Sequence, residues 1–99
     1  MDECVLTFYC ATIDREVVAD TLRALSSEPV HVRPQDVRGR DFSDAHAGEQ
    51  VRGNLQRTAI ELVTAATDVV ALVAAVAASR RSRPVRWHVT PLLARGRMD

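Results

Sequence analysis

Four extended apolar segments and two short helical segments alternate along this 99-residue chain in the order β-α-β-β-α-β. The first and third extended segments, residues 4–10 and 55–64, carry apolar side chains on both of their alternating faces. That pattern is typical of central strands that are covered on both sides. Two right-handed β-α-β crossovers therefore predict an α+β fold, a ferredoxin-like βαββαβ sandwich with an antiparallel sheet in the order 4-1-3-2 and two helices on one face. A chain of this length is expected to form a single domain, residues 1–99.

The first helix is predicted from its start and stop signals. Asp14 is a typical N-cap residue, and the segment from Ser26 to Pro29 provides the stop. Val18, Leu22 and Leu25 lie at positions i, i+4 and i+7, which predicts one buried stripe along the helix.

The second helix is predicted over residues 69–78, with Thr67 or Asp68 as its N-cap. Its body contains only valine, leucine and alanine, and a helix that is apolar nearly all round is expected to be substantially buried. Arg80 and Arg81 follow it, where positive charge suits the negative end of the helix dipole.

The second extended segment leads into a candidate functional loop. Pro34 cannot donate a ladder hydrogen bond, so its strand belongs at an edge of the sheet or carries a bulge. From residue 38 to residue 54 the chain is polar and interrupted by glycines. Loops longer than about 12–15 residues are often functional, so we predict that this loop recognises a partner and is the most mobile part of the free protein. Its candidate contact residues are Arg38, Arg40, His46, Glu49, Gln50 and Arg52.

Self-association is predicted because two helices can cover only one face of a four-stranded sheet. The second apolar face of the central strands then requires another cover, and a chain this small has no further element to supply it. A homo-oligomer is therefore expected.

Charge is balanced overall but divided between the two halves of the chain. Residues 1–50 contain 10 acidic residues and 5 arginines, a net charge of −5, whereas residues 51–99 contain 3 acidic residues and 8 arginines, a net charge of +5. We expect these charges to pair within and between subunits. A nucleic-acid surface is the alternative, but no nucleic-acid motif accompanies the basic cluster at residues 80–86, so no nucleic-acid partner is predicted.

The sequence also predicts where the protein is located. The acidic N-terminus lacks the basic start of a signal peptide, and the apolar stretch at residues 69–78 is too short to span a bilayer. Cys4 and Cys10 would lie about 20 Å apart in one extended strand, too far for a disulfide bond. A cytoplasmic protein without direct membrane insertion is expected.

Candidate catalytic and metal-binding groups are sparse. The three histidines fall in different predicted elements, and none has the close spacing of a zinc site. His46 shares the polar loop with acidic residues and with Ser43, which leaves a metal site or a nucleophile–base pair open, but a solvated polar loop is favoured. We predict neither enzymatic activity, nor a metal site, nor a cofactor. The histidines are His31, His46 and His88, and the acidic loop residues are Asp41, Asp44 and Glu49.

Several segments spread over nearly the whole chain follow a known pattern. They are Cys4–Tyr9, Glu49–Gly53, Thr58–Val63, Thr67–Val70, Trp87–Leu93 and Gly96–Arg97. Together they resemble PII-type signalling proteins and, more closely, an uncharacterised PII-like family of small bacterial proteins (domain of unknown function 3240) within the PII/CutA-like superfamily.

The resemblance implies a homotrimer with a mobile loop after the second strand and a regulatory, binding role. Members of the uncharacterised family often occur beside heavy-metal efflux systems, which implies that the loop docks on a membrane transporter. CutA-type metal-tolerance proteins share the architecture, so binding of a divalent metal or a small ligand is the alternative. PII proteins hold nucleotide phosphates with a glycine-rich basic loop after the second helix. Here Ala78–Pro84 contains arginines but no glycine, so we predict no tight ATP binding.

Overall fold

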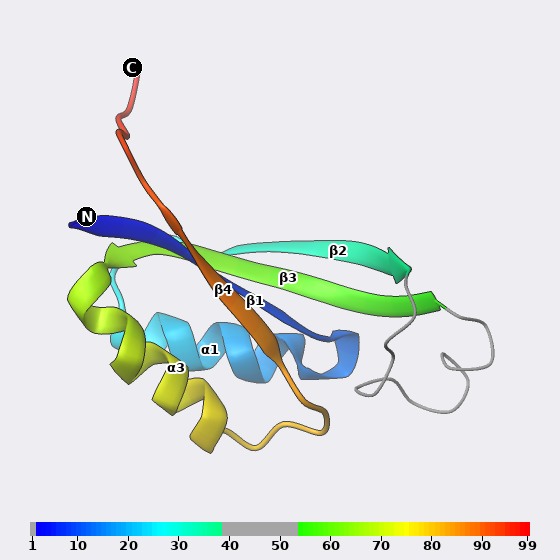
Figure 1. The fold of residues 1–99 in the computed structure, drawn as a ribbon. Coiled ribbons are helices and arrows are strands. Elements are labelled where there is room, and N and C mark those ends of the chain that lie inside the picture. The colour runs from blue at the N-terminus through cyan, green and yellow to red at the C-terminus, as the bar shows by residue number, and fades with distance from the viewer. Residues whose placement is uncertain (1, 39–53) are drawn as a thin grey trace.

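The computed structural model describes residues 2–38 and 54–99 (Figure 1). Their elements follow the predicted order, with a one-turn 3₁₀ helix leading into each α-helix. The strands are β1 (Glu3–Ala11), β2 (His31–Arg38), β3 (Asn54–Ala65) and β4 (Arg86–Pro91). The helices are α1 (Arg15–Leu25) and α3 (Val69–Ala78), preceded by the 3₁₀ turns Thr12–Asp14 and Ala66–Asp68.

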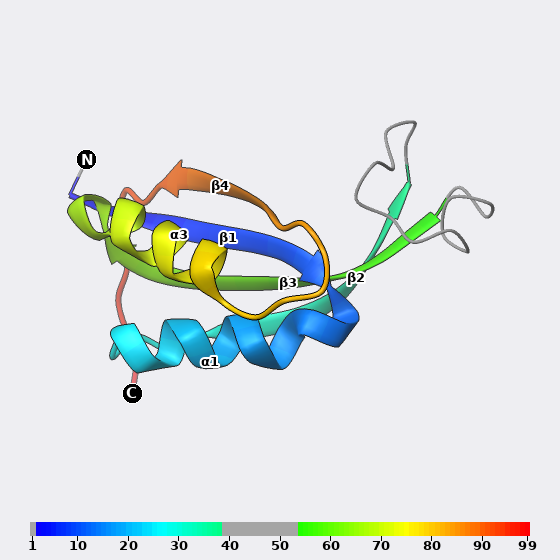
Figure 2. The ribbon, with the colours of Figure 1, turned by 90° about the horizontal axis from the view of Figure 1, so that it is seen from below.

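The sheet has the predicted topology. Its order is β2-β3-β1-β4, and every neighbouring pair is antiparallel. The central pairing aligns Leu6 with Leu62 and Phe8 with Ile60, so that large apolar side chains of both strands point to the same face. Pro34 lies in β2, the edge strand, where its missing N–H group removes no essential ladder bond. Both helices lie side by side against one face of the sheet (Figure 2).

The hydrophobic core lies between that face and the two helices. Its buried members come from the central strands and from one side of each helix. They are Leu6, Phe8, Cys10, Val18, Ala19, Leu22, Ile60, Leu62, Leu72 and Val76.

Two predictions about helix burial are wrong. Val18 and Leu22 are buried in α1, but Leu25 is 58% exposed because the helix ends there and its last turn extends beyond the core. In α3 only Leu72 and Val76 are buried, and Val70 is 79% exposed. Composition alone does not bury a helix, because a helix packed on one face of a sheet has only one side in contact with it. No helix in the described residues is both long enough and apolar enough to cross a membrane.

The predicted capping interactions are also absent. Asp14 and Asp68 stand at the N-cap positions of α1 and α3, but neither side chain makes a capping hydrogen bond. Each helix instead continues directly from a 3₁₀ turn, whose carbonyl groups accept the first helical N–H bonds. The Asp14 carboxylate is thereby left for another role, described below.

The face of the sheet opposite the helices is called the open face here. Its two central strands carry apolar side chains and one bonded polar pair in the middle, in which the Thr7 hydroxyl donates to Glu61 at 3.3 Å, and the charged residues Glu3 and Arg57 toward their ends. Glu61 also pairs with Arg33 of the edge strand at 3.0 Å. The register places these side chains on the open face: Val5, Thr7, Tyr9, Ala59, Glu61 and Val63 in the centre, and His31, Arg33, Arg86, His88 and Thr90 on the edges.

The difference between Leu22 and Leu25 gives a direct test of the core. Leu22→Ala is expected to lower the free energy of unfolding by about 2–5 kcal/mol, because a buried leucine is replaced by a cavity. Leu25→Ala, the matched control on the same helix, is expected to cost about 0.5 kcal/mol. Urea unfolding followed by circular dichroism, at one fixed protein concentration, measures both values. Equal losses would contradict this packing and restore the stripe predicted from the sequence.

Candidate functional site

The candidate site lies at the end of the sheet where residues 39–53 join it. Arg38 pairs with Asn54 as the last register pair between β2 and β3. At the same end β1 finishes at Ala11, opposite Arg57 of β3. We call this region the loop end of the sheet. The connection from α3 to β4, residues 79–85, also reaches the loop end (Figures 1 and 2).

Asp14 fastens the α3–β4 connection to the start of α1. Its carboxylate is 2% exposed and accepts the backbone N–H of Ser82 at 2.7 Å and that of Arg83 at 3.0 Å. Each oxygen of the carboxylate takes one bond, so the anion is held by two adjacent amides. This contact could not be predicted from the sequence, because backbone amides 68 and 69 positions away leave no mark in the residue pattern.

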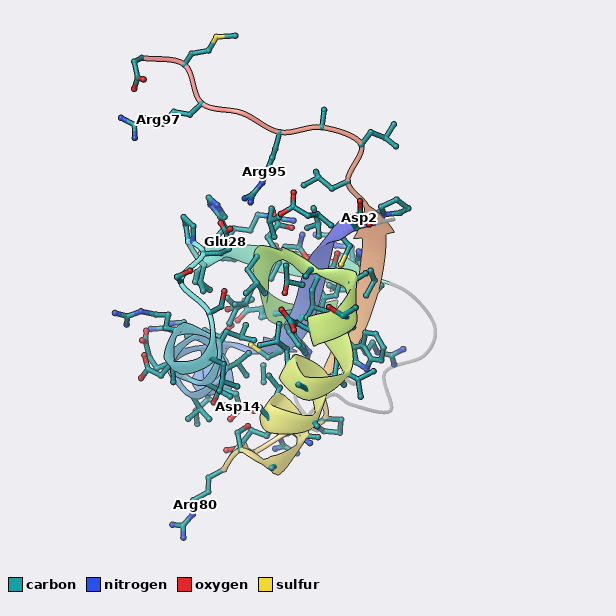
Figure 3. All side chains as sticks on the ribbon, turned by 90° about the vertical axis from the view of Figure 1, so that its left-hand side faces the viewer. Asp2, Asp14, Glu28, Arg80, Arg95 and Arg97 are labelled. Atoms are coloured by element: carbon teal, nitrogen blue, oxygen red, sulfur yellow. The ribbon has the colours of Figure 1, made fainter. Side chains whose placement is uncertain are left out.

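Arg80 and Arg81, at the start of the α3–β4 connection, point in different directions. Arg81 turns back onto the C-terminal end of α3, donating to the carbonyl oxygens of Val76 at 3.3 Å and Ala77 at 3.4 Å, and to that of Arg83 at 3.0 Å. The predicted stabilisation of the helix end by positive charge is confirmed for Arg81. Arg80 extends away from the body of the molecule (Figure 3).

Two adjoining cavities open at the loop end, with volumes of about 290 Å³ and 430 Å³. Thr12, Gln56 and Arg57 line both of them. Arg57 is 3% exposed, and one of its N–H groups donates to the Gln56 carbonyl oxygen at 2.8 Å. A largely buried guanidinium beside a cavity is suited to an anionic ligand, because its planar donors match carboxylate or phosphate oxygens. Ser82 and Arg83 complete the smaller cavity.

Cys10 lies next to this region, but its thiol is poorly reactive. Its thiol is fully buried and donates to the Thr58 carbonyl oxygen at 3.6 Å. Burial raises the pKa of the Cys10 thiol to about 11, and the negative charge of Asp14 adds to the rise. The reactive thiolate is therefore scarce at neutral pH. Cys4 is likewise buried and free, and burial raises its pKa, so the predicted absence of a disulfide between Cys4 and Cys10 is confirmed.

The predicted loop residues fall mainly beyond what the structure describes. Arg38 is the last residue of β2 and is exposed, at the stem of the loop. The other five, Arg40, His46, Glu49, Gln50 and Arg52, lie outside the described residues, and so does the acidic and histidine set considered as a metal site. What the sequence reasoning missed at this end is Asp14, Arg57 and Ser82, which come from three separate elements.

The two described histidines lie on opposite edges of the open face. His88 stacks at a tilt with Tyr9, with ring centroids 5.4 Å apart, and His31 stands on the far edge strand. Within residues 2–38 and 54–99, no three histidine, cysteine, aspartate or glutamate side chains converge as a metal site would require.

The chain was compared with models of protein families, with curated proteins and with solved structures. The model of a family described as a protein of unknown function (DUF3240) matches residues 1–99. The chain belongs to this family. Comparison with curated proteins finds no match.

Solved structures share the fold. A DUF3240 family protein from Shewanella baltica OS155 is 18% identical, with a TM-score of 0.80, and the match covers 100% of this chain and 99% of that one. PII of Arabidopsis thaliana, in a structure with bound citrate, is 15% identical, with a TM-score of 0.63 over 92% of this chain and 78% of that one. A Bacillus cereus protein related to NIF3 is 13% identical, with a TM-score of 0.66, and this chain covers only 26% of its length. The predicted membership of the uncharacterised family is confirmed, and the chain shares its fold with PII.

The link between Asp14 and the α3–β4 connection can be tested by removing its charge. Asp14→Asn keeps the size of the side chain but replaces one carboxylate oxygen by an amide donor, which faces another donor. A hydrogen bond to a charged group contributes about 1.5–3 kcal/mol, and we expect a loss of that size in the free energy of unfolding. Asp20→Asn on the exposed side of the same helix is the control, with an expected change within about 0.5 kcal/mol. Indistinguishable urea midpoints for the two variants would rule out a stabilising role for Asp14.

Proposed function

We propose that this chain is a PII-like regulatory protein that assembles with copies of itself and binds a partner protein through the loop between β2 and β3. The observation that carries the proposal is the PII-like fold with that loop at one end of the sheet, beside the Asp14-fastened connection and the two cavities. Its role is binding rather than catalysis. Arg38, Arg40, His46, Glu49, Gln50 and Arg52 are the proposed contacts.

Self-assembly through the open face is supported by how its residues are distributed. Val5 and Val63 are half-buried in the two central strands, whereas Arg33 and His88 lie on the edges. An apolar centre with a polar rim is the usual arrangement of a protein–protein interface. If the open face is buried in an interface, the polar side chains of Thr7, Glu61 and Arg33 are buried with it. These three already bond one another, so they keep their partners.

Multi-angle light scattering of the purified protein tests the assembly. Self-association at micromolar concentration is expected because the helices leave the open face of each copy without a cover, and a homotrimer is the assembly that the PII-like resemblance implies. Val63→Lys would place a charge in the centre of that face and is expected to shift the mass toward monomer. A wild-type mass equal to one chain across the micromolar range would contradict the proposed assembly.

A membrane transporter, specifically a metal-efflux transporter, is the partner that we propose for the loop. The loop carries basic, acidic and amide side chains in one short segment, which suits recognition of a polar protein surface. Arg38 and Asn54 form the last register pair of β2 and β3, so the loop is joined to adjacent strands at one end of the sheet.

Photo-crosslinking in cells tests this partner. A photo-reactive amino acid at position 40, inside the loop, is expected to give adducts with a membrane transport protein, identified by mass spectrometry. The same group at position 20, on the outer side of α1, is the control and is expected to give none of these adducts. Identical adducts at both positions, or none at position 40, would count against the loop as the recognition element.

Binding of a small anionic ligand is the second candidate, because Arg57 lines both cavities. The described residues of the α3–β4 connection are nevertheless poorly suited to binding nucleotide phosphates. The amides of Ser82 and Arg83, which could otherwise cradle an anion, already donate to the Asp14 carboxylate. Arg81 is likewise engaged by three carbonyl oxygens.

Isothermal titration calorimetry separates the candidates. We expect no saturable binding of ATP or magnesium ATP at micromolar affinity, because the anion position at Ser82 and Arg83 is taken by the protein's own carboxylate. The same titration with zinc or copper salts tests the CutA-like alternative. Micromolar saturation by ATP would contradict the first expectation, and stoichiometric metal binding would favour the alternative over the proposed partner-binding role.

A further inference from the structure

The last eight residues after β4 form an extended segment, Leu92–Asp99, which we call the arm. The arm leaves the sheet on the side away from the helices and passes across the end of the sheet opposite the loop end (Figures 1 and 3). Its root is fixed, because the backbone N–H of Leu92 donates to the Glu3 carbonyl oxygen at 3.3 Å.

Arg95 holds the arm in place through two carboxylates. Its two terminal nitrogens bond the two oxygens of Glu28 at 3.1 Å each, and one of them also lies 2.9 Å from a Glu3 oxygen. Figure 3 shows Arg95 directed from the arm toward Glu28 while Arg97 points elsewhere. The bonds from Arg95 lower the pKa of the Glu28 carboxyl, and Glu28 in turn raises the pKa of Arg95. The paired fork geometry fixes the direction as well as the position of the arm.

The arm buries almost none of its own apolar side chains in this chain. Leu93 is 98% exposed and Met98 is 100% exposed. Holding a segment in one direction costs conformational entropy, and Leu93 and Met98 contribute no burial against the described residues that would offset that cost. Large apolar groups on a fixed, projecting segment are typical of a surface that is completed by another molecule.

We propose that the arm docks on a second copy of this chain, packing Leu93 and Met98 against the copy that covers the open face. This inference rests on the proposed self-assembly and names a second element of it. The arm stands on the open-face side, and Val5 of that face pairs with Thr90, only two residues before the arm begins. The open face and the arm therefore form one continuous surface, and a second copy that covers the open face also contacts the arm.

The charges of the arm favour a second copy of this chain as the molecule that binds it. The arm's cation is neutralised by Glu3 and Glu28 of its own chain, and Arg97 pairs with Asp99 at 2.8 Å. The arm thus offers a neutral apolar contact rather than a net charge that would select a nucleic acid or an acidic peptide. The neighbouring Val5 and Val63 on the open face offer the same kind of surface.

Sedimentation equilibrium of the full chain tests the proposal. Leu93→Asp is expected to weaken self-association about tenfold or more, since burying a leucine contributes at least the 1.4 kcal/mol that corresponds to a factor of ten. Arg97→Ala, on the same arm, is the matched control and is expected to associate like the wild type. Because Leu93 is 98% exposed, its replacement leaves the chain's own core intact, which thermal unfolding by circular dichroism verifies.

A second readout uses crosslinking in the purified protein. A photo-reactive amino acid at position 93 is expected to join two chains, whereas the same group at position 20 on α1 is not. If the wild type associates but Leu93→Asp associates equally well and position 93 gives no chain-to-chain product, the arm proposal is overturned while self-assembly stands. A wild type that remains a monomer overturns the self-assembly on which the arm proposal rests.

Discussion

One-sided coverage of the sheet is the constraint from which the other features follow. The central pair β1 and β3 presents Leu6, Phe8, Ile60 and Leu62 to α1 and α3, and those two helices are all that the described chain has for covering a sheet. The open face is left with Val5, Val63 and the Thr7–Glu61 pair in its centre and with Arg33, Arg86 and two histidines on its edges. A domain this small gains stability by burying such a face, which connects the packing of one chain to the proposed assembly of several.

The sequence predicted the architecture because the signals for it are local. Pro34 marks an edge strand through its own missing N–H group, and two-sided apolar alternation marks the central strands. Burial within the helices was predicted less well. Leu25 has the same spacing as Leu22 but lies where α1 ends, and Val70 belongs to an apolar helix that contacts the sheet with one side only. Periodicity gives the face of a helix, whereas the extent of contact depends on where neighbouring elements stop.

The candidate site was predicted only in part, for a related reason. The polar segment after β2 stands out by composition, and Arg38 is found at its stem. Asp14 reads as an ordinary cap, yet its carboxylate binds the amides of Ser82 and Arg83, which the sequence alone cannot bring near it. The absence of glycine in residues 78–84 did point to weak phosphate binding. The structure adds a physical cause for that expectation, because a carboxylate already takes the two amides that an anion would use.

The two ends of the sheet carry different kinds of chemistry, and their separation has a consequence for regulation. At the loop end, the β2–β3 loop joins beside the cavities and Arg57; at the opposite end, Arg95 ties the arm to Glu3 and Glu28. The long central strands β1 and β3 connect the two ends in a continuous ladder. If copies assemble through the open face and the arm, the ends of β2 and β3 that carry the loop are brought together in several copies. Partner recognition would then depend on assembly through valency, since several linked loops engage an oligomeric partner more tightly than one loop does.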